Sequence, residues 1–129
     1  MNQKEEAEKL AALGAAMAFL AVAAGAFGAH ALKSKLQPLQ MHVYETGVQY
    51  HMYHALGILA VAALAQTMPA KKKLFYTIGK FFALGILLFS GSLYLLAVIN
   101  IKLLGIITPF GGVCFLAGWA MLVRAALKD

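Results

Sequence analysis

The chain has 129 residues, of which 62% are hydrophobic and only 12% are charged. A soluble domain usually carries about 25% charged residues, so this composition excludes an ordinary water-soluble domain and indicates a lipid bilayer as the solvent. Eleven basic and five acidic residues give a net charge of +6. The basic residues flank apolar runs and do not form an amphipathic surface with interleaved aromatic residues, so we expect no nucleic-acid partner.

Four apolar segments are long enough to cross a bilayer, which takes roughly 20 mainly apolar residues. They cover residues 10–31, about 43–67, 75–99 and 108–127. Pro38 and Pro69 fall between these segments, and Pro109 follows Thr108, which is a favourable start for a helix. The sequence therefore predicts an all-α integral membrane protein, a four-helix bundle that forms a single domain over residues 1–129.

The distribution of basic residues predicts how the bundle is oriented. Eight of them lie in the N-terminal segment, the second connection and the C-terminal segment, against three in the first and third connections. Basic residues next to membrane spans favour the cytoplasmic side. We therefore expect a multi-pass protein of the cell (inner or plasma) membrane with both termini in the cytoplasm, and the cluster of Lys71, Lys72 and Lys73 is the main determinant.

Small residues recur in the first span at a spacing that lets helix backbones approach closely. The positions concerned are Gly14, Ala18, Ala21, Gly25 and Ala29. This pattern predicts a tightly packed bundle.

All four histidines and the internal carboxylate Glu45 gather around the first connection. Counting about 20 residues outward from the lysines at the inner ends places His30 and His51 at the outer membrane interface. His54 lies one turn deeper, and the third span brings Tyr94 to a similar depth. The sequence thus predicts a cluster of His and Tyr side chains at the extracytoplasmic face.

Two interpretations of these histidines are possible. His51 and His54, three positions apart, could chelate a metal together with His30, and three imidazoles suit zinc with an open position. Glu45 and His54 lie on opposite helix faces, at about 100° per residue, and could not share one ion. The structural alternative is that a polar group as deep as His54 needs a partner. We therefore expect His54 to form an interhelical hydrogen bond with Tyr94 or Thr108.

Several motifs in this order resemble a known family. They are Gly25-Ala26-Phe27-Gly28-Ala29-His30, Glu45-Thr46, Tyr50-x-x-x-His54-Ala55-Leu56, Gly91-Ser92-Leu93-Tyr94, Thr108-Pro109-x-Gly111-Gly112 and Gly118-Trp119. Together they resemble the small bacterial membrane proteins of the YwdK/YgdD type, domain-of-unknown-function family 423, to which eukaryotic transmembrane-protein-256 sequences look related. The resemblance implies a multi-pass protein of the bacterial cell membrane without an agreed activity.

The same resemblance ranks the candidate residues. The family often has Gln where His51 stands, so a three-histidine metal site is less favoured than a shared role for His30, His54 and Tyr94. With Glu45, these are the candidate binding residues, and no catalytic residue is predicted.

Three classes of function remain open from the sequence. We favour a non-catalytic module that binds lipid or a membrane-protein partner, or assembles as a homo-oligomer, because the spans contain no nucleophile–base pair and no acidic pair; the same observation argues against an enzyme. The second class is a small transporter or channel formed by an oligomer, although no charged residue lies at mid-membrane. The third is a redox protein that binds metal, haem or quinone through His30, His51 and His54.

Overall fold

The structure is a computed structural model that describes residues 2–128. Its elements in chain order are α1 (Gln3–Phe27), the π-helical turn η1 (Gly28–Leu32), α2 (Pro38–Thr67), the 3-10 turn η2 (Pro69–Lys71), α3 (Lys72–Gly85), the π-helical turn η3 (Ile86–Ser90), α4 (Gly91–Ile99), the 3-10 turn η4 (Lys102–Ile106) and α5 (Thr108–Leu127). Within residues 2–128 there is no strand. Four helical runs are long and apolar enough to cross a membrane, which confirms the predicted all-α four-helix membrane class.

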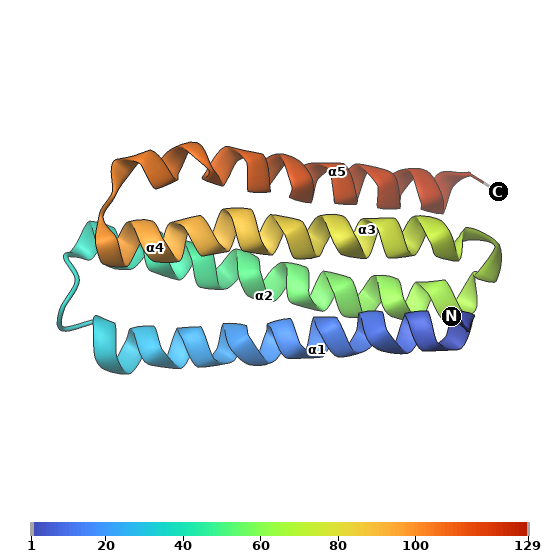
Figure 1. Cartoon of the computed structure of the whole chain (residues 1–129), viewed down its shortest axis with the longest axis horizontal. Helices are drawn as coiled ribbons and strands as arrows, with labels where there is room; N and C mark the ends of the chain where they lie inside the picture. Colours follow the sequence, from blue (N-terminus) through green and yellow to red (C-terminus); the bar gives the residue numbers. More distant parts are fainter. Residues whose placement is uncertain (1, 129) are drawn as a thin grey trace.

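The four runs lie side by side along the long axis of the molecule, with both chain ends at the same end (Figure 1). The α2 helix and the α3–α4 run form the central pair; α1 packs on α2, and α5 packs on α3 and η3. In the most apolar stretch of each run, 44% and 39% of residues are buried in the two central runs, against 17% in each outer run. The outer helices therefore direct most of their surface toward the surroundings.

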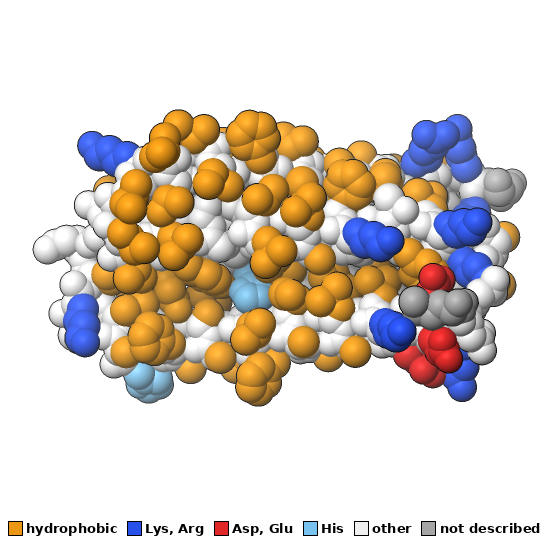
Figure 2. Space-filling model, in the orientation of Figure 1, with side chains coloured by type: hydrophobic (Ala, Val, Ile, Leu, Met, Phe, Trp, Pro, Cys, Tyr) orange, Lys and Arg blue, Asp and Glu red, His pale blue; other side chains and the backbone are white. Residues whose placement is uncertain are grey.

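On the face that Figure 2 shows, charged side chains gather toward the two ends of the bundle, and hydrophobic side chains cover most of the surface between them. This is the surface that a bilayer requires, because charge is costly within the hydrocarbon. Both termini lie on one side of such a bilayer. That this side is the cytoplasm remains a prediction from the distribution of lysines.

Local sequence explains where the helices begin and end. Asn2 caps α1 and forms a capping box with Glu5. Pro38 lies in the first turn of α2, whose start is five residues earlier than the apolar segment predicted, and a proline at this point needs no amide donor. Asn100 ends α4 in the left-handed conformation, with φ 58° and ψ 39°, which asparagine adopts more readily than most residues.

Small residues bring α1 close to α2, as the sequence predicted. A Cβ on Gly14 would lie 2.9 Å from the Leu59 side chain, and a Cβ on Gly28 would lie 2.5 Å from the Tyr44 ring. Ala21 is buried between these two contacts. A Cβ on Gly14 would also lie 3.0 Å from the backbone nitrogen of Leu59, so a larger side chain there would force the two helices apart.

The apolar core has two parts. The larger part joins α1, α2, α3, η3 and α5 and includes Ile58, Phe82 and Phe115. The smaller part, near the first connection, is formed by Leu32, Tyr44 and Ala97. Four polar side chains are also buried within the described residues: His51, His54, Ser90 and Ser92.

Candidate functional site

The two buried histidines lie at the centre of α2. His51 is 13 positions after Pro38, and His54 is 13 positions before Thr67. At a rise of 1.5 Å per residue, each is about 20 Å from the nearer end of the helix. The two histidines thus lie at the middle of α2. Their depth in a bilayer, where the sequence places His51 at the outer interface, remains a prediction.

Both ring nitrogens of His54 are hydrogen-bonded within the protein. The indole N–H of Trp119 on α5 donates to Nε2 at 3.0 Å, and Nδ1 lies 2.7 Å from the carbonyl oxygen of Tyr50. An indole N–H can only donate, so Nε2 carries the lone pair and Nδ1 carries the proton. His54 is therefore a neutral imidazole in one tautomer. The predicted interhelical hydrogen bond is present, but the expected partners, Tyr94 and Thr108, were wrong.

The expected partner Tyr94 binds the other buried histidine instead. Its hydroxyl oxygen on α4 lies 2.8 Å from Nδ1 of His51. The Nε2 atom of His51 is buried and has no hydrogen-bond partner among residues 2–128. The main chain of Met17 on α1 is close to this ring but outside hydrogen-bond geometry. The two histidines thus connect α2 to different helices, α4 and α5.

A π-helical turn places further groups beside them. Ser90, the last residue of η3, is fully buried and donates from Oγ to the carbonyl oxygen of Gly47 at 2.7 Å. The preceding residue, Phe89, contacts α5, where its backbone lies against Gly111. Such π-helical turns occur frequently at functional sites. We use the term polar layer below for His51, His54, Ser90, Tyr94 and Trp119.

The remaining sequence-predicted residues lie outside the polar layer. His30 is exposed in η1, and Glu45 is exposed on α2. Across residues 2–128, no group of three His, Cys, Asp or Glu side chains is placed to hold a metal ion. The three histidines considered for zinc do not converge, and His30 is not brought to His54 and Tyr94.

An open groove of about 520 Å³ runs between α2 and α5 beside the polar layer. The α2–α5 groove is lined by Tyr50, Tyr53, His54, Phe89, Phe115 and Trp119, with Gly112 and Leu116. The His54 ring stacks on Phe115, with centroids 3.4 Å apart and planes 9° from parallel. The Tyr50 and Phe89 rings meet with centroids 4.7 Å apart. No charged side chain is among the lining residues.

Sequence reasoning missed Trp119 as the partner of His54, because nothing local indicates that α5 meets α2. The available signal was the Gly118-Trp119 pair. A Cβ on Gly118 would lie 2.5 Å from the Phe82 ring, so this glycine lets α5 approach α3 closely. Because of this close approach, the next residue, Trp119, lies within hydrogen-bonding distance of His54 on α2.

Comparison with known proteins identifies relatives over most of the chain. A family model described as "Protein of unknown function (DUF423)" matches residues 24–112. The UPF0382 membrane protein YwdK of Bacillus subtilis is 53% identical over 116 residues, which cover 90% of this chain and 94% of the relative. The UPF0382 membrane protein SSP2132 of Staphylococcus saprophyticus is 45% identical, with the same coverage of 90% and 94%. The UPF0382 inner membrane protein YgdD of Escherichia coli K12 is 44% identical over 110 residues, which cover 85% and 82%.

No solved structure matches the chain. The family match includes four of the five residues of the polar layer, and Trp119 follows the matched segment. With four apolar helices and relatives named as membrane proteins, the protein is a multi-pass protein of the cell membrane. The chain belongs to the DUF423 family, whose function is unknown.

Proposed function

We propose that this protein is a non-catalytic lipid-binding module whose α2–α5 groove holds one hydrocarbon chain of a membrane-dissolved molecule. The observation that carries the proposal is the groove itself, an aromatic, uncharged recess beside the middle of α2. Its volume of about 520 Å³ falls within the range of about 300–1,000 Å³ typical of small-molecule sites.

The polar atoms of the groove indicate what else the ligand carries. His54 and Trp119 bond to each other, so they offer no unmatched polar group. Tyr50 and Tyr53 are 39% and 55% exposed along the groove, and their hydroxyls make no hydrogen bond within residues 2–128. Burying a hydroxyl in hydrocarbon without a partner costs free energy. A ligand with an oxygen acceptor next to its chain would supply that partner.

Two classes of membrane molecule share this chemistry: an ester-linked glycerolipid and an isoprenoid quinone. The first test distinguishes them. The full chain is purified from its native membranes in a mild non-ionic detergent, and the bound molecules are extracted for mass spectrometry and ultraviolet absorption. A quinone gives an absorption band that a reducing agent alters, and a glycerolipid gives none. Protein that carries neither molecule would contradict the proposal.

A second test locates the ligand. Lipids and quinones with a diazirine on the chain are added in liposomes, and adducts are mapped after illumination. Gly112→Leu should fill the groove, because a Cβ there would have its nearest neighbour, a Phe89 ring atom, at 3.9 Å. Gly91→Leu is the matched control: it adds the same side chain on α4, where no atom lies within 4 Å.

Labelling of α5 peptides should fall in Gly112→Leu and stay at the wild-type level in Gly91→Leu. Equal labelling of all three proteins would show that the chain lies elsewhere. Adducts with the mass of another polypeptide would show that a protein helix, and not a lipid, occupies this face.

A further inference from the structure

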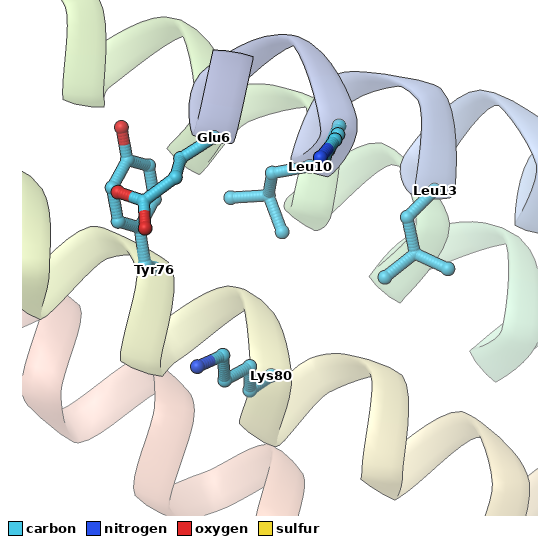
Figure 3. Close-up of a pocket in the computed structure, with 6 residues that line it drawn as sticks. Glu6, Leu10, Leu13, Tyr76 and Lys80 are labelled. Atoms are coloured by element: carbon cyan, nitrogen blue, oxygen red, sulfur yellow. The ribbon is translucent and has the colours of Figure 1, made fainter. Parts of the chain in front are cut away.

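A second hollow, of about 290 Å³, lies between α1 and α3 near the chain ends. The α1–α3 cleft is lined by Glu6, Lys9, Leu10, Leu13, Tyr76 and Lys80. Leu10 and Leu13 extend from α1 into the space, Lys80 lies across it on α3, and Glu6 and Tyr76 lie next to each other at its end (Figure 3). The cleft is formed by different helices from the α2–α5 groove, so it is a separate feature.

The walls of the cleft are held by direct contacts between the two helices. The Tyr76 hydroxyl donates to the carbonyl oxygen of Gln3 at 3.0 Å. A Cβ on Gly79 would lie 2.7 Å from the Leu10 side chain, so α1 and α3 touch there. These contacts fix the spacing of the helices while the space beside them stays open.

The lining residues are ordered by depth in the way a phospholipid is. Lys9 is six positions after Gln3, and Lys80 is eight positions after Lys72, so they lie roughly 9 and 12 Å from the helix ends. The helical runs that contain these lysines, Gln3–Leu32 and Pro69–Ile99, have 30 and 31 residues and are longer than the hydrocarbon core is thick, about 30 Å. Both lysines can therefore reach the level of the headgroups. Leu13 lies one turn further in, at the level of the acyl chains.

The charges of the cleft favour one class of headgroup. Basic side chains outnumber acidic ones among the lining residues, two lysines against Glu6, which favours a headgroup with a negative charge. Basic residues near a membrane surface attract anionic lipid. The Glu6 carboxylate can only accept hydrogen bonds, so it favours a headgroup with hydroxyl donors over a bare phosphate.

We propose that the α1–α3 cleft binds a phospholipid with a single negative charge and a hydroxylated headgroup, of the phosphatidylglycerol type. Its phosphate lies between Lys9 and Lys80, its headgroup hydroxyls donate to Glu6, and one acyl chain covers Leu10 and Leu13. The proposal does not depend on the α2–α5 groove or on what occupies it.

The test is a lipid titration of the full chain in a non-ionic detergent, followed by native mass spectrometry. Phosphatidylglycerol and phosphatidylcholine with identical chains are compared for the wild type, Lys9→Gln/Lys80→Gln and Lys33→Gln/Lys35→Gln. The last variant is the matched control, since it removes the same charge from exposed positions at the opposite end. At about 1 kcal/mol per lysine near a membrane surface, affinity for phosphatidylglycerol should fall about 30-fold in the first variant and little in the control.

Further arms test the headgroup and the chain. Glu6→Gln should reduce the preference for phosphatidylglycerol over phosphatidic acid, because the acceptor for the headgroup hydroxyls is lost. Soluble glycerophosphoglycerol should not displace the lipid, since it lacks the chain that covers the leucines. The proposal is overturned by unchanged affinity in Lys9→Gln/Lys80→Gln, by an equal loss in the control, or by displacement with the soluble headgroup.

Discussion

Two adjacent glycines at the start of α5 offer a matched test of how closely that helix approaches the π-helical turn. A Cβ added at Gly111 would lie 2.6 Å from Cβ and 2.7 Å from Cα of Phe89, whereas a Cβ added at Gly112 would have its nearest neighbour at 3.9 Å. Carbon atoms pack at about 3.5–4.0 Å. Alanine at position 111 therefore forces α5 away from η3 by about 1 Å. Alanine at position 112 fits without any displacement of α5.

The two substitutions have most of their energetics in common. Each replaces glycine by alanine inside a helix, which favours the helix by about 0.8–1 kcal/mol. This gain cancels when the two variants are compared. What remains is the steric cost at Gly111, and overpacking of a filled core costs typically about 1–3 kcal/mol. We expect Gly111→Ala to be less stable than Gly112→Ala by about that amount, with Gly112→Ala at or above the wild type.

The assay is reversible unfolding by SDS in mixed micelles, followed by the fluorescence of Trp119, the only tryptophan of the chain. Gly91→Ala, on α4 with no atom within 4 Å of its added Cβ, controls for the helix-forming gain alone. If the free energies of unfolding of Gly111→Ala and Gly112→Ala agreed within about 0.5 kcal/mol, near the error of such comparisons, α5 would not lie against the backbone of Phe89.

The same SDS unfolding checks the polar layer and the α4 cap, followed here by far-ultraviolet circular dichroism because Trp119→Phe removes the only tryptophan. Trp119→Phe removes the donor to His54 and should lower stability by about 1–2 kcal/mol; in a double-mutant cycle with His54→Phe the coupling should be about 0.6–1.7 kcal/mol, and zero coupling would exclude the bond. Tyr94→Phe should cost about 0.5–1.5 kcal/mol through the lost bond to His51, and an effect that persists unchanged in a His51→Phe background would contradict that pairing. Asn100→Gly should be neutral, whereas Asn100→Val should cost about 1–2 kcal/mol because of its left-handed backbone; equal stability of the two would argue against that conformation.

The number of helices and their class follow from the sequence because both depend on local signals. Long apolar runs identify the spans, and the prolines at 38, 69 and 109 mark the breaks between them. The start of α5 at Thr108 agrees with the residue that hydropathy and Pro109 indicated. The start of α2 does not, because the turn that follows Pro38 is helical without being apolar.

The partners of the buried histidines could not be predicted, because they depend on which helices touch. Depth alone made Tyr94 and Thr108 reasonable partners for His54. In the structure Thr108 is 2.6 Å from Ser92, between Oγ1 and Oγ, and Tyr94 is taken by His51. The resemblance to a family that often has Gln at position 51 weakened the case for His51. A glutamine amide can also donate to or accept from a tyrosine hydroxyl, so that exchange is compatible with a structural pair.

The position of the polar layer limits what it can do. A polar side chain that is buried between helices, away from water, needs a partner from the protein or from a ligand. His54, Ser90 and Tyr94 have protein partners on neighbouring helices. These bonds are directional, whereas apolar side chains could slide past one another, so the layer fixes how α2 faces α4 and α5. The α2–α5 groove borders this fixed point, and its shape is therefore set before any ligand arrives. A groove that is already formed can select a chain by fit, because little conformational entropy is lost on binding.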